Sequence, residues 1–435
     1  MNRRAFSVAA IAVTLAAGCQ NTPTSAPPEA RVSVQTVKQE TDAIFEKLVA
    51  IRRDIHEHPE LAGNEVRTAT KIATHLRGLG LEVRTGLYGQ SVIGVLRGAR
   101  PGKTVAWRAD LDALPGFYPD PEPFRSKTPN VHHACGHDIH IAIALGMAEV
   151  LAKQRASLSG NVVFIFQPEE ETFKGAQGLI ERGLLTQMKL DEIYGVHVTA
   201  FSAGEIRVRP GEMFAYQRRV RIALKNELSK AQVEALTKHV QGAMFRARPD
   251  AKPWEIQRLV DPAVGVGVPS TSFQDFLFMD SNFDSQVENG ELRLSAYLYE
   301  TNAANLSTLI PRIEAAVAAS GHKAQLLDVS FVQANPTVMN DPELTRAAVT
   351  ALERASVPNT VLPLYGQAPF FNDDFAYFQQ RVPGVYFFLG GSNFQKGMIA
   401  FNHAPNFHAD EETIRSGVQS FSALLLSRLG VVVQK

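Results

Sequence analysis

The sequence predicts an α/β protein whose main domain is discontinuous and carries an inserted α+β domain. The chain has 435 residues, 45% of them hydrophobic, which is more than one hydrophobic core usually serves, so two domains are expected. Short apolar runs that end in acidic residues or histidines recur along the chain, as in an open parallel sheet covered on both faces. Metal-type residues occur before Val198 and again at His403 but not convincingly between Glu212 and Val332, so the middle of the chain is interpreted as the insertion.

The N-terminus has the pattern of a bacterial export signal. Two arginines and the apolar stretch Ser7–Ala17 precede Cys19, and this order is typical of a secretory signal. The segment resembles a lipobox, which would make Cys19 the lipidated first residue of the mature protein, and the paired arginines resemble a twin-arginine signal. We expect a signal peptide at 1–18, a tether at 19–40, and a protein lipid-anchored to a bacterial membrane facing the periplasm or exterior. A plain cleaved signal and a soluble periplasmic protein are the alternative.

Cysteine usage and charge narrow the classes of function. Cys19 and Cys135 are the two cysteines of the sequence, so no internal disulfide is expected and Cys135 is free to bind metal. The 44 basic and 44 acidic residues balance. Such a balance gives no electrostatic footprint for nucleic acid, so no nucleic-acid partner is expected, and contact with a membrane is expected only through the lipid anchor.

Cys135 and His137 form the first candidate pair of metal ligands. They stand two apart with Gly136 between them, just before the apolar run Ile139–Val150, which predicts a buried helix. A thiolate and an imidazole at one helix entrance suit zinc. A buried cysteine beside an ordinary histidine is the alternative for the pair taken alone.

Three predicted strands deliver further candidates to the carboxyl edge of the sheet. The strands at 105–109, 161–167 and 193–196 lead into Asp110, the three glutamates after Pro168, and His197. If the first strand continues, its two-residue spacing puts Asp110 and Asp112 on one face. For the glutamate run alone, a solvated acidic turn is the alternative.

The chain resembles the M20 family of metallopeptidases, and within it the amidohydrolase branch of hippurate hydrolases, auxin-conjugate hydrolases and N-acyl amino acid deacylases. The resemblance rests on ordered blocks that cover both ends of the chain. These blocks are Arg52–Leu61, Arg108–Pro115, His133–Asp138, Phe164–Glu171 with Gly175 and Ala176 after it, Gly195–His197, Asp373–Tyr377 and His403–Phe407.

The resemblance implies a metal centre with one or two divalent ions, for which zinc is expected and manganese, cobalt or nickel are alternatives. Its implied ligands are Cys135, His137, Glu171, His197 and His403. The register of the glutamate run, counted from Gln167 or back from Gly175, makes Glu170 the catalytic base. Adjacent residues that leave a strand point to opposite sides, so Glu170 and Glu171 are expected to diverge. Asp110 is expected to orient a ligand from behind.

The region 213–332 predicts a ferredoxin-like lid and dimerisation domain between the two parts, 41–212 and 333–435, of a zinc-peptidase-like α/β/α catalytic domain. Its pattern reads strand, helix, strand, strand, helix, strand. The expected elements are 218–224, 229–244, 276–284, 291–300, 304–319 and 324–332. In relatives such an insert is a lid and dimer surface, so a homodimer through this domain is a further expectation.

The insert departs from the branch, because it lacks the Gly-x-Gly-Gly-His and Asn-Val-Ile-Pro motifs. His239 and Asn282 are guesses for the missing lid histidine, and the substrate-binding residues stay unknown. The segment Arg246–Ser272 predicts an extra loop that could close over the site. Phe370 and Phe371 either line an apolar acyl pocket or pack in the core.

For several other polar residues the sequence leaves more than one role open. His140 matches a family histidine and has either a structural or a direct role. His56 and His58, with two arginines before them, favour surface or packing roles on a helix. Asp373 and Asp374 either support the site or cap a loop. His132 and His408 are interpreted as bystanders.

The predicted function is that of a metal-dependent hydrolase that cleaves the amide bond of N-acyl amino acids or similar small amides. A metal ion activates water, and Glu170 is expected to act as general base. A dipeptidase or carboxypeptidase of the same family is the alternative, and a relative that binds metal or a small ligand without catalysis is a second one. The intact Glu170 favours the enzyme, since a pure binder needs no base.

Overall fold

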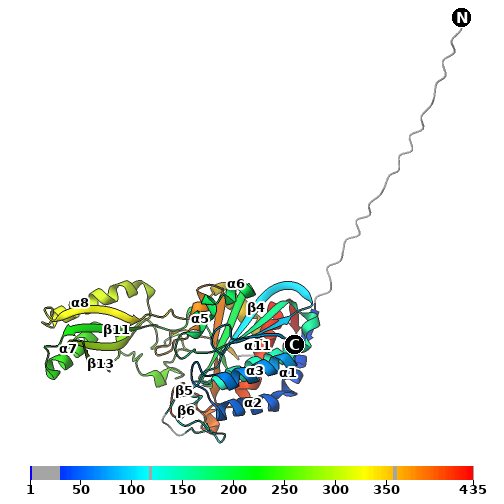
Figure 1. The fold of residues 1–435 in the computed structure, drawn as a ribbon, viewed down its shortest axis with the longest axis horizontal. Coiled ribbons are helices and arrows are strands. Elements are labelled where there is room, and N and C mark those ends of the chain that lie inside the picture. The colour runs from blue at the N-terminus through cyan, green and yellow to red at the C-terminus, as the bar shows by residue number, and fades with distance from the viewer. Residues whose placement is uncertain (2–29, 117–119, 356–359, 435) are drawn as a thin grey trace.

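The computed structural model describes residue 1 and residues 30–116, 120–355 and 360–434. Figure 1 shows two bodies, a larger one built on a broad sheet and a smaller one that contains α7, α8 and β11. The predicted signal peptide and the predicted lipidation site, Cys19, lie outside the described residues. None of the helices within the described part of the chain combines the length and apolar character that crossing a bilayer requires.

The larger body is built on a sheet in which eight of the described strands lie in the order β17-β9-β18-β8-β4-β7-β3-β2. The four central strands β18, β8, β4 and β7 run parallel, and three of them, β4, β7 and β8, contain the strands predicted from the sequence. The bounds are β2 Glu82–Thr85, β3 Val92–Arg97, β4 Arg100–Asp110, β7 Ser159–Gln167, β8 Glu192–Ser202, β9 Ile206–Val208, β17 Val361–Pro363 and β18 Gly384–Ser392.

Alternate side chains of the central strands enter two separate hydrophobic cores. Trp107 and Phe166 point to the core under α2, α3, α4, α9 and α11, whereas Ala106 and Ile165 point to the core under α5, α6 and α10. The helices are α1 Val34–Asp42, α2 Phe45–Glu57, α3 Val66–Gly78, α4 His137–Lys153, α5 Gly175–Glu181, α6 Leu184–Met188, α9 Pro342–Ala355, α10 Phe375–Gln379 and α11 Glu412–Arg428. The result is the predicted α/β/α sandwich (Figure 1).

The smaller body has the predicted ferredoxin-like order of elements. Its sheet runs β12-β14-β11-β15 with every pair antiparallel, and β13 pairs with β14 beside β12. The strand expected at 276–284 is split into two short strands. The bounds are β11 Tyr216–Lys225, α7 Lys230–Ala243, β12 Leu277–Met279, β13 Asp284–Glu288, β14 Glu291–Glu300, α8 Leu309–Ala319 and β15 Leu326–Gln333. The predicted fold class is confirmed.

The tether expected at 19–40 is wrong from residue 30 onward. β1, Ala30–Ser33, pairs in parallel with β19, Val431–Gln434, and α1 follows at once with Ser33 as its cap. Val32 and Val37 are buried in the main core, so this segment belongs to the catalytic body. Composition alone could not reveal a partner strand from the other end of the chain.

The segment Arg246–Ser272 is docked on the larger body although it is part of the inserted region. The carbonyl of Val266 accepts the N–H of Tyr365 at 2.8 Å, and Phe273, just beyond the segment, accepts the N–H of Gln367 at 2.9 Å. Leu259 and Val266 are buried in the second core. The segment is therefore a bridge between the two bodies.

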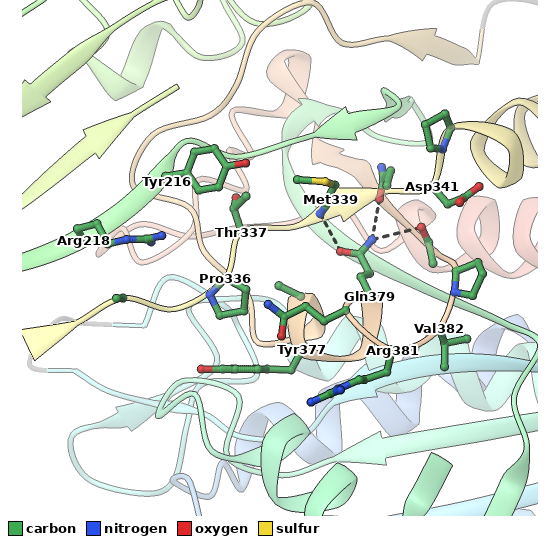
Figure 2. A pocket seen from close by; sticks show the side chains of 17 residues that line it. Tyr216, Arg218, Pro336, Thr337, Met339, Asp341, Tyr377, Gln379, Arg381 and Val382 are labelled. Carbon is green, nitrogen blue, oxygen red and sulfur yellow. Dashed lines mark hydrogen bonds between the residues drawn. The ribbon is translucent and has the colours of Figure 1, made fainter. Parts of the chain in front are cut away.

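A large cavity lies at the junction where the chain re-enters the larger body (Figure 2). It measures about 820 Å³, and its lining includes Tyr216, Arg218 and Gln379 but none of the predicted metal ligands. Gln379 accepts the N–H of Met339 at 2.9 Å and donates to the side chain of Asn340 at 3.0 Å. These bonds hold the returning chain segment in place, so the cavity lies at the junction of the two bodies and not at the predicted metal centre.

We predict that Gly146→Ala lowers the free energy of unfolding, because α4 is crossed there by its neighbours. An added Cβ would lie 2.6 Å from Leu48 Cδ1 and 2.6 Å from Val418 Cγ2. Such overpacking costs about 1–3 kcal/mol, more than the roughly 0.5–1 kcal/mol that alanine gains over glycine in a helix. Urea denaturation measures the change. The control is Gly242→Ala in α7, where nothing lies within 4 Å and a small gain is expected; equal midpoints for the two variants would contradict the prediction.

Candidate metal centre

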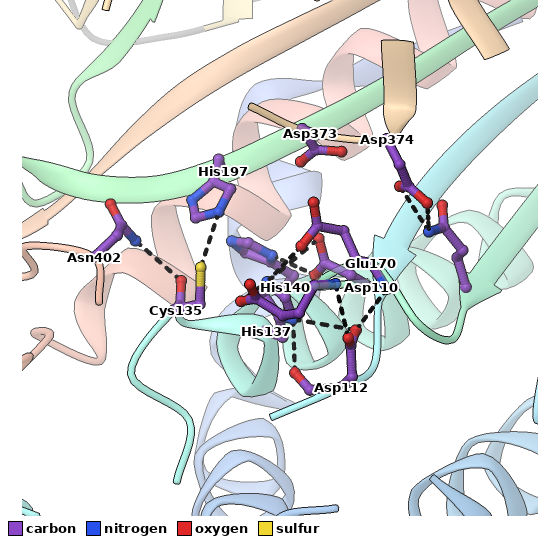
Figure 3. Close-up of polar contacts among 12 residues, drawn as sticks. Asp110, Asp112, Cys135, His137, His140, Glu170, His197, Asp373, Asp374 and Asn402 are labelled. Atoms are coloured by element: carbon purple, nitrogen blue, oxygen red, sulfur yellow. Dashed lines mark hydrogen bonds and ion pairs between the residues drawn. The ribbon is translucent and has the colours of Figure 1, made fainter. Parts of the chain in front are cut away.

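The five predicted ligands converge on one edge of the large sheet, and Figure 3 shows three of them, Cys135, His137 and His197. The sulfur of Cys135 lies 3.3 Å from Nε2 of His197 and 3.2 Å from Nε2 of His403. Glu171 Oε1 lies 3.3 Å from His403 Nε2 and 3.9 Å from His137 Nε2. Donor atoms from four separate segments of the chain therefore face a common point.

The turn at Gly136 brings Cys135 and His137 to this point. Gly136 has φ of +90°, a left-handed conformation that glycine adopts freely, and it is the N-cap of α4. An added Cβ would also lie 3.1 Å from the ring of Phe407. The cysteine consequently ends the loop and the histidine begins the helix, with both side chains on the same side.

The ligand histidines present their Nε2 atoms to the site. Nδ1–H of His137 donates to the carbonyl of Asp112 at 2.7 Å, and Nδ1–H of His197 donates to the carbonyl of Val198 at 2.9 Å. Each Nε2 therefore carries a lone pair. Nε2 of His137 is buried and, among the described residues, has no hydrogen-bond partner. A divalent cation would satisfy this orphaned donor atom, so the residues present fit a metal ion.

The two carboxylates do not diverge as expected. β7 ends at Gln167, and Glu169 has φ of +56°, so the glutamates lie in a turn where strand alternation no longer applies. Oε2 of Glu170 and Oε1 of Glu171 both lie 3.9 Å from Nε2 of His137. The predicted base and the predicted ligand thus lie on the same side of the site.

Asp112 holds this turn in place, and its importance was missed from the sequence. Its carboxylate accepts the N–H of Glu170 at 3.0 Å and that of Glu171 at 2.9 Å, while its carbonyl accepts from His137. β4 ends at Asp110, so Asp112 is not on the same strand face as expected. Its spacing from Asp110 was visible, but the backbone amides it accepts from could be placed only in three dimensions.

Asp110 is connected to the predicted ligand His197 through another side chain, that of His140. Its Oδ1 accepts Nδ1–H of His140 at 2.6 Å, and Nε2 of His140 accepts the N–H of Val198, next to His197, at 2.9 Å. Both nitrogens of His140 are therefore engaged, which makes it a structural brace. Asp110 Oδ2 also lies 3.8 Å from His137 Nε2. The expected supporting role of Asp110 is thus exerted through His140.

Comparison with known proteins places this fold and site. A family model described as peptidase family M20/M25/M40 matches residues 106–427. Thermostable carboxypeptidase 1 of Saccharolobus solfataricus is 31% identical over 90% of this chain and 98% of its own length. N-acetyldiaminopimelate deacetylase of Enterococcus faecalis is 31% identical over 88% of this chain and 98% of its own length. The chain belongs to the M20 family.

A solved structure of the family agrees with this assignment. The Bacillus subtilis YXEP protein, described as a dinuclear metal-binding peptidase, superposes with a TM-score of 0.72 and 26% identity, covering 90% of this chain and all of its own. This M20 chain is accordingly an amide-bond hydrolase of the same architecture, with the metal-type residues of its own site gathered at the sheet edge.

Burial sets the protonation of the ligands in this M20 site. Burial, together with the nearby carboxylates of Glu171 and Glu170, raises the pKa of the Cys135 thiol well above its usual range. Burial and the neighbouring His140 lower the pKa of His197 well below its usual value. The neutral imidazole can bind a cation directly, whereas the thiol releases a proton when it becomes a ligand.

Glu170, the predicted base, is surrounded by a buried network of charged side chains. Burial raises the pKa of Glu170 well above its usual range, and the carboxylates of Asp373 and Glu171 add to the effect. Arg108, fully buried, donates to Asp110 at 2.6 Å and to Asp374 at 2.8 Å. This guanidinium keeps several carboxylates together behind Glu170.

Asp373 and Asp374 combine the two roles expected for them. Asp374 accepts from the Gln167 side chain at 2.8 Å and from the N–H of Ala176 at 2.8 Å. Asp373 lies 3.1 Å from Arg108 Nη2 and accepts the N–H of Phe375 at 2.8 Å at the start of α10. The pair therefore supports the site and also anchors the start of α10.

A second buried network lies behind His137. The ring of His56 is held between the carboxylates of Asp138 and Asp120, each at 2.9 Å. Arg52 donates to Asp138 and Glu122, each at 2.8 Å. His56 is buried, in agreement with its expected packing role. Since Asp138 follows His137 directly, the network fixes the first turn of α4.

The remaining histidines lie at different distances from the predicted metal ligands. His408 lies 3.3 Å from a carboxylate oxygen of Glu122, so it belongs to the edge of this second network rather than being a bystander. His58 donates to the carbonyl of Asp54 at 2.9 Å, away from the ligands. His239 and Asn282 are exposed in the smaller body and are not among the residues that line the cavity at the ligands. Neither guess for the lid histidine is placed at the site of this chain.

We predict that Asp112→Ala weakens zinc binding by about 10–100-fold, the range for loss of a group that supports metal ligands. The substitution frees two buried N–H groups and lets the glutamate turn move. Competition with a chromophoric chelator measures the affinity, and Asp112→Asn, which keeps one oxygen, is a second variant. The control is Asp191→Ala, because Asp191 accepts the N–H of Thr104 at 2.8 Å at an exposed position away from the ligands. A folded Asp112→Ala protein with the affinity of the control would contradict this role.

We predict that His56→Gln removes a pH-dependent part of the stability. Although burial opposes its charge, hydrogen bonds to Asp120 and Asp138 raise the pKa of His56 to about 9. Since a free histidine titrates near pH 6.5, the stabilisation is complete below that pH and is lost as the pH rises through 9, with a size on the order of 3 kcal/mol at most.

Urea unfolding of the metal-loaded protein at pH 6 and pH 9.5 tests this sign. The difference between the wild type and His56→Gln should be large at pH 6 and small at pH 9.5. His239→Gln, which removes an exposed histidine of α7, serves as the control. A difference that grows toward alkaline pH would show that the ring is bound as the neutral form.

Proposed function

We propose that this M20 hydrolase cleaves the amide bond of N-acyl amino acids or similar small amides, with Glu170 as general base. The observation that supports the proposal is the position of Glu170. It is 4% exposed, lines the cavity that four of the five predicted ligands also line, and lies 3.9 Å from Nε2 of the fifth, His137. A base that activates water must be a carboxylate that lies beside the metal ligands without being a ligand itself.

We assign the metal ligands to Cys135, His137, Glu171, His197 and His403, which would hold one or two divalent ions, with zinc favoured by the thiolate. When bound, such an ion lowers the pKa of water toward neutrality and polarises the substrate carbonyl. Glu170 takes the proton from the attacking water and returns it to the nitrogen of the departing amine. Asp112 keeps Glu170 and Glu171 at their separation while this proton moves.

The lining of the cavity favours an uncharged acyl group over the ammonium group of a dipeptide. The cavity measures about 510 Å³ and has six large apolar or aromatic side chains among its described lining residues. The six are Phe173, Ile256, Tyr297, Phe370, Phe371 and Phe401. The deacetylase among the relatives fits this preference, and the carboxypeptidase shares the same amide chemistry.

The N-terminal motif supports the further proposal that the enzyme is exported and lipid-anchored through Cys19. The ferredoxin-like domain likewise supports a homodimer as its partner arrangement. Both proposals derive from the sequence pattern and the family resemblance.

We predict that Glu170→Gln retains metal and lowers kcat by about 10²–10⁴-fold, the usual contribution of a general base. The variant removes the proton acceptor and leaves the five donors in place. Metal content is measured by elemental analysis, and turnover with zinc, manganese or cobalt against a panel of N-acyl amino acids and dipeptides.

The neighbouring Glu169→Gln is the matched control, because three glutamates follow Pro168 and Glu169 is not among the residues that line the cavity. Its kcat should stay near that of the wild type. If Glu169→Gln loses activity and Glu170→Gln keeps the wild-type kcat, the base has been assigned to the wrong glutamate. Bound metal without hydrolysis anywhere in the wild-type panel would favour the non-catalytic binder.

A further inference from the structure

A second hollow adjoins the cavity at the metal ligands, and we call it the aromatic trough. It measures about 580 Å³, and its aromatic lining is Phe245, Trp254, Phe278 and Phe370. Phe370 lines both the trough and the metal-site cavity. The two hollows therefore meet at this one ring.

The aromatic rings of the trough form a continuous row. Ring centroids are 5.6 Å apart between Phe370 and Phe278, 6.3 Å between Phe278 and Trp254, and 5.7 Å between Trp254 and Phe245. Three of these side chains are unusually exposed for their type, Phe245 at 48%, Trp254 at 42% and Phe370 at 39%. Apolar side chains that gather on a surface mark a place where an apolar ligand is bound.

The position of Phe370 is enforced by its surroundings. Its φ of +63° is rare for a bulky side chain and costs free energy, so contacts must hold it there. The ring of Tyr299 supplies one such contact, with centroids 4.6 Å apart. Strained conformations of this kind concentrate at ligand sites.

The bridging segment Arg246–Ser272 contributes to both hollows. Trp254 lines the trough, and Ile256, two residues later, lines the metal-site cavity. The hydrogen bonds from Val266 and Phe273 to the larger body fix this segment in place. The trough and the cavity thus share the ring of Phe370, and the 254–256 stretch supplies one side chain to each of them.

We propose that the aromatic trough binds the far end of a long apolar acyl chain whose amide carbonyl lies at the metal centre. This inference rests on the proposed function and narrows its substrate class to amides with acyl chains of medium to long length. The acyl side is favoured over the amino acid side because an amino acid carries a carboxylate. The described lining of the trough is mostly aromatic or apolar, and it pairs one cation, Lys238, with one carboxylate, Asp280, so it offers no net positive charge to bind a carboxylate.

A series of N-acylglycines tests the proposal on the full-length, zinc-loaded enzyme. We measure kcat/KM for the acetyl, butanoyl, octanoyl and dodecanoyl members below their micelle concentrations. Each methylene that enters the trough should raise kcat/KM by up to about fourfold, the equivalent of burying one methylene. The expected result is a rise that continues to octanoyl or beyond.

Trp254→Ala and Phe245→Ala are the decisive variants, each tested separately so that one misfolded protein does not end the experiment. Each should lower the ratio of the dodecanoyl to the acetyl rate by at least about tenfold, because the end of the chain loses its contacts. Phe394→Ala is the matched control. Phe394 is also an exposed aromatic side chain, at 55%, but it lines neither hollow, so its ratio should equal that of the wild type.

Several outcomes would overturn the proposal. Acetyl hydrolysis with no dependence on chain length would refute it while the proposed function stands, whereas failure to hydrolyse any member would refute both. Unchanged ratios in folded Trp254→Ala and Phe245→Ala enzymes would also refute it. The proposal would also be refuted if the two variants changed only the hydrolysis rates of N-acetyl amino acids that differ in their side chains. Finally, if the two variants no longer form dimers in sedimentation but keep the wild-type ratio of dodecanoyl to acetyl rates, the trough binds a second copy of the chain and not the acyl group.

Discussion

The carboxylate of Asp112 accepts two backbone N–H groups, those of Glu170 and Glu171, while its carbonyl accepts the ring N–H of His137. One residue thereby sets the distances among the base and two ligand side chains from different segments. The arrangement works because buried N–H groups must find acceptors, and a carboxylate satisfies two at once. Without it, the glutamate turn after β7 would have no fixed relation to the start of α4.

Two buried guanidinium groups allow so many carboxylates to lie inside one protein. Arg108 binds the acidic residues behind Glu170, and Arg52 binds those behind His137. Buried charges are costly unless they are paired, and both arginines have several partners. The predicted ligand cluster is therefore held from behind on two sides, and four of its members, Cys135, Glu171, His197 and His403, line the cavity in front.

The sequence predicted the fold well where the signal was local. Local sequence patterns predicted β4 and β7 in the larger body and β11 and β14 in the smaller one, because burial leaves a direct mark on the order of apolar and polar residues. The ordered family motifs selected five ligand candidates, and the structure brings them together. The long-range features escaped prediction, namely the pairing of β1 with β19, the docking of Arg246–Ser272 and the two amides held by Asp112. Each depends on a partner distant in the chain, which local patterns do not encode.

The parallel pairing of Ala30–Ser33 with Val431–Gln434 has a consequence for biosynthesis. A ribosome makes these strands at widely separated times, so the earlier one has no partner until translation reaches the later one. The helix α1, which follows β1 directly, also packs against α11 and must wait for it. The catalytic body therefore cannot complete this part of its fold until the last residues of the described chain have left the ribosome.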